Sequence, residues 1–165
     1  MSDSEPVRRH VARILLFDAN DRLLLFFARD GVEPTNPPYW YLPGGGMHDG
    51  ESPEQAARRE LVEEAGVVTA EIGAVVARFR GIRFQFEGHD FEQDEWLVTG
   101  RLLDGRLGQG RVDDGESAAV AAHRWWSMDE LNEVDAVMYP TRLPEMVTRL
   151  LRDGAPSEPW VFESN

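Results

Sequence analysis

The sequence predicts an α+β fold in which a mixed β-sheet lies between helices. Apolar stretches rich in Val, Leu, Phe and Trp recur along the chain with the length and alternation of strands. A capped helix is expected near the middle, at residues 53–65, and an amphipathic helix near the C-terminus, at residues 141–152. Strands combined with a central and a C-terminal helix are typical of a three-layer α+β domain.

Length and composition suit one soluble domain. The chain has 165 residues, enough for a substantial core, and we expect residues 1–6 to form a flexible tail and residues 7–165 a single domain. The absence of Cys excludes disulfides and thiolate metal sites. The N-terminal residues lack an apolar signal core, and no apolar run approaches membrane-spanning length. We therefore expect a cytoplasmic protein with no membrane partner.

The charge of the chain constrains its partners. The formal net charge is −13, which disfavours a nucleic acid polymer as a partner because both molecules are polyanions. A small phosphorylated substrate can still bind where cations neutralise it locally. We therefore expect a small phosphorylated molecule as the substrate.

The N-terminal quarter predicts two strands and a long loop. Residues 7–17 and 22–29 are apolar and β-rich, and the polar residues 18–21 form the turn between them. Residues 30–39 contain three prolines and one glycine and are expected to form a loop long enough to line a site. This loop leads through Trp40 to the glycine-rich turn Pro43–Gly46, where glycine permits a close approach of backbones.

The central helix has recognisable ends. Ser52 is a good N-cap, Pro53 suits the first helical position, and Gln55 completes a capping box. Gly66 stands where a helix commonly ends in a left-handed residue. One narrow stripe of small and apolar side chains is expected to face the core: Ala57, Leu61 and Ala65.

The remaining chain predicts further strands and two helices. A strand at 71–86 is expected to bend at Gly81, and the acidic stretch 87–95 and the glycine-rich stretch 104–117 are expected to be loops. The other expected elements are strands at 95–103, 118–127 and 159–162, a short helix at 128–133 capped by Ser127, and the C-terminal helix.

Three glutamates share one face of the central helix. Glu60, Glu63 and Glu64 stand at i, i+3 and i+4, where like charges repel by about 0.2–0.5 kcal/mol per pair. A divalent cation such as Mg²⁺ would relieve this repulsion, since it takes hard oxygen ligands. The alternative is a solvated acidic face with no ligand.

The complete pattern around these glutamates is G-x5-E-x7-R-E-U-x-E-E-x-G-U, with U aliphatic, from Gly45 to Val67. It resembles the Nudix box, and every fixed position is met. Nine such positions would match by chance on the order of once in ten million. One departure is His48, which stands where many boxes have a glutamate. His48 is expected to be a surface loop residue, and its presence affects only an accessory metal shell.

The resemblance implies the Nudix fold and hydrolysis of a diphosphate linkage with Mg²⁺, or alternatively Mn²⁺. The metal ligands that it implies are Gly44, through its carbonyl, Glu51, Glu60, Glu63 and Glu64. Glu60 could instead orient or deprotonate the attacking water, because family members differ in which carboxylate is the base. Arg59 is expected to hold a glutamate through a bidentate hydrogen bond and, less favoured, to contact substrate.

Family members often add a carboxylate from outside the box. Glu116 is the best placed, just before the strand at 118–127, with Asp113 and Asp114 as alternates. Glu92 and Glu95 are weaker candidates from the acidic stretch. Each of these could equally be a solvated loop residue.

The substrate is less well defined by the sequence. Trp40, Tyr41, Phe84 or Phe86 could stack on a base, although aromatic residues on strands more often belong to the core. No Pro or Tyr follows the box at the spacing associated with ADP-ribose or dinucleoside polyphosphate hydrolysis.

Three functions remain open. The first is a Mg²⁺-dependent hydrolase of a small nucleotide or nucleoside diphosphate derivative. The second is a hydrolase of a sugar or isoprenoid diphosphate. The third is a non-catalytic ligand sensor with a Nudix fold, although such modules usually lose box carboxylates. A homodimer is one assembly compatible with each of them.

Overall fold

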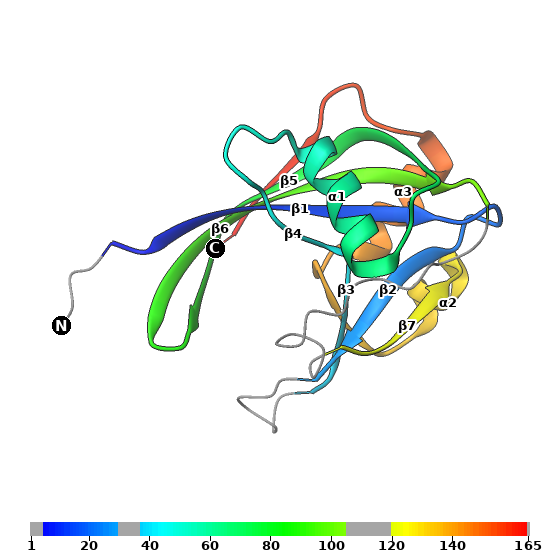
Figure 1. Cartoon of the computed structure of the whole chain (residues 1–165). Coiled ribbons are helices and arrows are strands. Elements are labelled where there is room, and N and C mark those ends of the chain that lie inside the picture. Colours follow the sequence, from blue (N-terminus) through cyan, green and yellow to red (C-terminus); the bar gives the residue numbers. More distant parts are fainter. Residues whose placement is uncertain (1–4, 30–36, 105–119, 165) are drawn as a thin grey trace.

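The computed structural model describes residues 5–29, 37–104 and 120–164, which form one mixed sheet with helices on both faces (Figure 1). The helices are α1 (Pro53–Ala65), α2 (Met128–Glu133) and α3 (Leu143–Asp153). The strands are β1 (Val7–Phe17), β2 (Leu23–Ala28), β3 (Tyr39–Tyr41), β4 (Gly44–Gly46), β5 (Ala70–Phe86), β6 (His89–Leu102), β7 (Val120–Trp126), β8 (Val137–Tyr139) and β9 (Trp160–Glu163).

Strand β1 is the centre of the sheet. The strand order is β8-β3-β2-β1-β6-β5-β9, with β4 paired to β1 and β7 paired to β2. β1 runs parallel to β6 along its whole length but pairs with β2 only at Phe17 and Leu23. The two halves of the sheet diverge from this point, and β4 fills the space beside β1 that β2 leaves (Figure 1).

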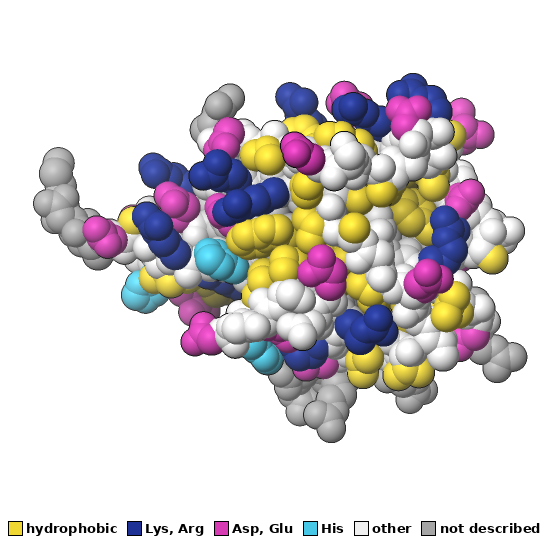
Figure 2. Space-filling model, turned by 90° about the horizontal axis from the view of Figure 1, so that it is seen from above, with side chains coloured by type: hydrophobic (Ala, Val, Ile, Leu, Met, Phe, Trp, Pro, Cys, Tyr) yellow, Lys and Arg dark blue, Asp and Glu magenta, His cyan; other side chains and the backbone are white. Residues whose placement is uncertain are grey.

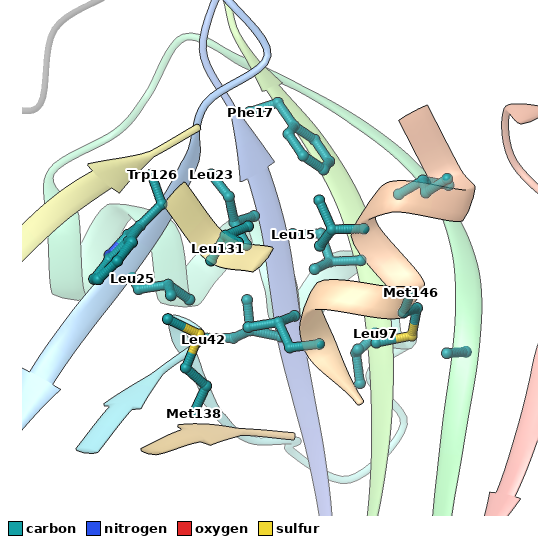
Figure 3. Close-up of a cluster of buried hydrophobic side chains, with 14 of the residues drawn as sticks. Leu15, Phe17, Leu23, Leu25, Leu42, Leu97, Trp126, Leu131, Met138 and Met146 are labelled. Carbon is teal, nitrogen blue, oxygen red and sulfur yellow. The ribbon is translucent and has the colours of Figure 1, made fainter. Parts of the chain in front are cut away.

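Alternate side chains of β1 supply two hydrophobic clusters, one on each face of the sheet. Leu15 and Phe17 belong to the cluster beneath α2 and α3, which also contains Leu23, Leu25, Leu42, Leu97, Trp126, Leu131, Met138 and Met146 (Figure 3). Ile14 and Leu16 belong to the other cluster, with Leu24, Ala57, Leu61, Ala65, Val67 and Val98 around α1. Each fully buried leucine contributes about 1.5–3 kcal/mol. The sheet therefore lies between α1 and the other two helices, which confirms the predicted fold class.

Both predicted helix caps are present. The Ser52 side chain accepts from the Gln55 amide at 3.1 Å, and the Gln55 side chain accepts from the Ser52 amide at 2.9 Å. Gly66 ends α1 in the left-handed conformation, with φ 61°. Ser127 and Glu130 form a second capping box at the start of α2. These local interactions fix the first and last residues of α1.

The prediction of an acidic loop at 87–95 was wrong, because β6 already begins at His89. The turn consists of Glu87 and Gly88, with φ of 48° and 78°, as in a type I′ hairpin turn. The acidic side chains of β6 pair across the hairpin with arginines of β5: Arg83 lies 3.1 Å from Glu92, and Arg78 lies 2.7 Å from Asp94. Cross-strand charge pairing therefore keeps this polar sequence in a strand.

Three short strands were not expected. Gly44–Gly46, predicted as a turn, forms β4 because it pairs with β1, while β3 and β8 pair with each other in parallel. The predicted bend of β5 is present, with a shift of register between Phe79 and Ile82 around Gly81. The glycine-rich loop lies outside the described residues except for Asp104.

Charge is spread rather than segregated over the face in Figure 2, where arginine and acidic side chains are interspersed. Among the described residues, no helix combines the length and hydropathy needed to cross a membrane.

Candidate active site

The candidate site forms where β4 meets α1. Gly44 lies opposite Arg13, and Gly45 lies opposite Ala12. Gly44 has φ 144°, and a Cβ there would collide with the carbonyl oxygen of Ala12. A Cβ at Gly45 would lie 2.5 Å from Oε1 of Glu60. Gly44 therefore requires glycine, whereas a side chain at Gly45 would displace the Glu60 carboxylate, because β4 is pressed between β1 and the carboxylate face of α1.

The three glutamates of α1 have different surroundings. Glu60 is only 8% exposed and lies against Gly45. The Glu63 side chain is 51% exposed. Oε2 of Glu64 accepts from the Gly44 amide at 3.2 Å. One helical turn therefore carries both a buried carboxylate, Glu60, and a solvent-exposed one, Glu63.

Arg59 connects the loop before α1 to the glutamates of the helix. Its Nε and Nη2 donate to the two carboxylate oxygens of Glu51, each at 2.9 Å, so the bidentate contact is made with Glu51. Nη1 donates to Glu60 at 2.9 Å and to Glu63 at 3.2 Å. Nη2 also donates to the Gly46 carbonyl at 2.8 Å. One planar guanidinium thereby fixes three carboxylates and the end of β4.

This network shifts the pKa of its members. The hydrogen bonds from Arg59 lower the pKa of Glu51 to about 2, even though partial burial acts in the opposite direction, and the His48 amide adds a further hydrogen bond at 3.0 Å. The pKa of Arg59 is raised, first by its hydrogen bonds to Glu51. Both groups are therefore charged at neutral pH.

The donor set suits a hard cation. Glu51, Glu60, Glu63 and Glu64 offer only oxygen, and the Gly44 amide contacts Glu64, so the glycine turn adjoins them. Among the described residues, however, no three acidic or histidine side chains are gathered closely enough to hold a metal ion. Arg59 contacts three of these carboxylates instead. Glu63 is exposed, so its carboxylate can leave Arg59 and turn toward a cation without disturbing the core.

The aromatic candidates lie apart from one another. Trp40 packs edge-on against Trp126, with ring centroids 5.1 Å apart, and Tyr41 lies 5.9 Å from Phe26 on the opposite face. Phe84 stacks on Phe91 within the hairpin of β5 and β6. The structure does not bring Phe84 together with Trp40 and Tyr41.

The remaining candidates have varied positions. His48 is exposed, and Glu92 pairs with Arg83 in the hairpin. Oε1 of Glu95 lies 3.6 Å from Nε of Arg13 on β1. Glu116, Asp113 and Asp114 lie outside the described residues.

Sequence reasoning overlooked Arg13. Its Nη1 donates to the carbonyls of Leu42 at 3.4 Å and Gly44 at 3.3 Å, while its Nε faces Glu95. The available signal was a charged residue within the otherwise apolar second half of β1, between Ala12 and Ile14. A charge in that setting requires polar partners.

Comparison with known proteins identifies the family. A model of the NUDIX domain matches residues 7–146. A "Putative 8-oxo-dGTP diphosphatase" of Bacillus subtilis is 32% identical over 120 residues, covering 73% of this chain and 67% of that protein. An RNA pyrophosphohydrolase of Nitrobacter winogradskyi is 31% identical over 145 residues, covering 78% of this chain and 81% of that protein. Nudix hydrolase 25 of Arabidopsis thaliana is 61% identical over 53 residues, which span 32% of this chain and 28% of that protein.

The fold agrees with these sequence matches. A NUDIX hydrolase of Nitrosomonas europaea superposes with a TM-score of 0.63 at 19% identity, covering 98% of this chain and 82% of that one. The mixed sheet, the box helix and the glycine turn thus define a Nudix domain. The chain belongs to the Nudix family, and the predicted class, a Nudix-type enzyme, is confirmed.

Proposed function

We propose that the protein is a Mg²⁺-dependent hydrolase that cleaves a diphosphate linkage in a small nucleotide or nucleoside diphosphate derivative. The observation that carries this proposal is the carboxylate face of α1, where Glu60, Glu63 and Glu64 adjoin the glycine turn. These are the oxygen donors that a site for phosphate chemistry requires, and Arg59 holds the surrounding loop in place.

Each residue has a distinct role in the proposed reaction. Water attacks a phosphorus atom, the bond from that phosphorus to the bridging oxygen breaks, and the two halves leave as phosphorylated products. Glu63 and Glu64 would hold the cation together with the Gly44 carbonyl, and Glu51 would hold an accessory one. A bound Mg²⁺ would neutralise phosphate charge and polarise the phosphoryl group.

Glu60 is suited to receive the proton of the attacking water. It is the most buried of the three glutamates, and two neighbours fix its carboxylate: Gly45 packs against it and Arg59 donates to it at 2.9 Å. A base in fixed geometry is more effective than a mobile one. Glu60 could alternatively serve as a ligand, with Glu116 as the base.

The names of the relatives support a nucleotide substrate. The Bacillus subtilis protein is named for 8-oxo-dGTP and the Nitrobacter winogradskyi protein for RNA, so both names refer to nucleotide compounds. The net charge of −13 favours the small substrate over the polymer. Sugar and isoprenoid diphosphates remain the alternative, because the proposed metal-binding carboxylates would serve a diphosphate regardless of the group attached to it.

A substrate panel tests the proposal. Release of phosphate, diphosphate or nucleoside monophosphate should be measured with and without Mg²⁺ from nucleoside triphosphates, nucleoside diphosphate derivatives, a 5′-triphosphate RNA and sugar or isoprenoid diphosphates. We expect Mg²⁺-dependent turnover that is highest on a small nucleotide. Preference for RNA or for an isoprenoid would correct the substrate class. Tight binding without turnover of any compound would favour the sensor.

A further inference from the structure

We propose that Arg13 is a positioning residue of the site, which holds the Gly44 carbonyl in place with Glu95 as the anchor of its guanidinium. The inference deepens the proposed function and rests on it, because Gly44 matters only if its carbonyl serves the cation. Arg13 lies outside the Nudix box, on a different strand from every residue considered so far for the chemistry.

The backbone of β4 explains why Gly44 needs a side-chain partner. The Ile14 amide donates to Pro43 at 2.8 Å, and the Met47 amide donates to His10 at 2.8 Å. Hydrogen-bonded pairs alternate along an antiparallel ladder, so Gly44 falls between two such pairs and its own polar groups turn away from β1. They must find other partners if they are to be satisfied.

Both polar groups of Gly44 find partners in side chains. Its amide donates to Glu64 of the box at 3.2 Å, and its carbonyl accepts from Arg13 at 3.3 Å. A carbonyl oxygen has two lone pairs, so the bond from Arg13 leaves one lone pair free for a cation. Gly44 thus links a box glutamate on one face of the sheet to an arginine on the other, since Arg13 shares the face of Leu15.

Arg13 is itself fixed. Its Nε lies 3.6 Å from Oε1 of Glu95, and the same oxygen accepts from the Gln93 side chain at 2.7 Å. Gln93 is 6% exposed, and the Glu95 side chain is 13% exposed. Ordering an arginine side chain costs conformational entropy. The partly buried Gln93 and Glu95 of the neighbouring strand β6 restrict the mobility of the Arg13 side chain.

Glu95, a weaker candidate for the additional carboxylate from outside the box, has a different role in this inference. In the described structure Glu95 neutralises Arg13 rather than joining the glutamates of α1. The series Gln93, Glu95, Arg13, Gly44 and Glu64 is continuous, because consecutive members have polar atoms between 2.7 and 3.6 Å apart. A change at Glu95 should therefore reach the site through Arg13.

Variants at both residues test the inference, with Mn²⁺ as the probe. Mn²⁺ affinity measured by the EPR signal of the free ion should fall at least about fivefold in Arg13→Gln, which is ~1 kcal/mol, and less in Glu95→Gln. Arg13→Lys should recover part of the affinity, because it keeps the charge but loses the planar fork. With a turned-over substrate, kcat should fall while KM changes less than about twofold.

Arg101→Gln is the matched control. Arg101 likewise donates to a backbone carbonyl, that of Asp18, and pairs with a carboxylate, that of Asp21, at the far end of β6. Its removal should leave Mn²⁺ affinity unchanged. A rise in KM alone in Arg13→Gln would place Arg13 on the substrate, and unchanged Mn²⁺ affinity and kcat would exclude any role. Either result would overturn the inference.

A measurement without metal separates this inference from the proposed function. Exchange of the amide hydrogens of residues 44–47 in the metal-free protein should be faster in Arg13→Gln than in the wild type or in Arg101→Gln. Unchanged exchange would show that Arg13 does not hold Gly44. If the wild type neither binds Mn²⁺ nor turns over any diphosphate, the proposed function fails, and the exchange result still decides whether Arg13 fixes Gly44.

Discussion

Gly45 and Glu60 are packed so closely that a Cβ on residue 45 would lie 2.5 Å from the Glu60 carboxylate. No contact of this kind exists at the adjacent Gly46, where a Cβ would find no atom within 4 Å. The pair of glycines therefore offers a sharp test of how much the site depends on the placement of Glu60.

Gly45→Ala should displace the Glu60 carboxylate and lower turnover at least tenfold, or about 1.4 kcal/mol of barrier. Gly46→Ala should keep turnover within about twofold, because its new methyl group meets open space. The measurement is kcat for each variant after circular dichroism has verified the fold. Equal rates in the two variants would contradict a positional role for Glu60.

Glu63→Gln should remove most Mg²⁺-dependent turnover, because it deletes a ligand charge from an exposed position. Relief of the like-charge repulsion among the three glutamates would favour a gain in stability. Glu63 also pairs with Arg59 at 3.2 Å, so the loss of this ion pair opposes the relief of repulsion. We therefore expect the free energy of unfolding without metal to change by less than about 1 kcal/mol. Glu54→Gln, in the first turn of α1, is the control. Wild-type rates in Mg²⁺ would refute the ligand assignment.

Arg59→Lys should lower kcat with a small change in KM, because lysine keeps the charge but cannot make the bidentate hydrogen bond to both carboxylate oxygens of Glu51. Arg58→Lys changes the preceding, exposed residue of α1 in the same way and should have no effect. An effect confined to KM would instead place Arg59 against the substrate.

Glu116→Gln should lower turnover at least tenfold, about 1.4 kcal/mol, and remove the acidic limb of the pH–rate profile if Glu116 is the base. Asp113→Asn and Asp114→Asn remove the same charge from the same stretch of chain and serve as controls. Mild and equal effects in all three would leave Glu60 as the first candidate for the base.

Asp18→Asn should destabilise the protein at neutral pH and less so in acid. Burial raises the pKa of Asp18, but the amides of Arg22 and Asn20 and the Arg22 guanidinium outweigh it and lower the pKa below its usual value. This stabilisation is complete above the unfolded pKa of about 3.9 and is lost as pH falls through the lower folded pKa. Urea unfolding at neutral and acidic pH measures the difference.

The sequence was sufficient wherever the deciding interactions are local. Ser52, Gln55 and Gly66 define the ends of α1 from within four residues, and the box glutamates share a face because of helical spacing alone. The glycine run was interpreted as a turn, since its pairing with β1 joins residues more than thirty positions apart.

Polar contacts between residues far apart in the sequence could not be predicted either. The acidic stretch of β6 looks like a loop until its carboxylates are seen opposite Arg78 and Arg83. The position of Arg13 near Gly44 and Glu95 depends on two separate strand pairings. The residues next to Arg13 in the sequence do not indicate either of these strand pairings.

The two-residue turn at Glu87–Gly88 has a consequence for the order in which the sheet assembles. The hairpin of β5 and β6 can begin with contacts between close neighbours, such as Gln85 with Asp90, and extend from there, and hairpins form in about 1–10 μs. Strand β1 must bring Val7 to Phe91 across about half of the chain, a slower loop closure. The ribbon of β5 and β6 would thus be the template on which β1 docks, and the contact of Arg13 with Glu95 would form only with that event.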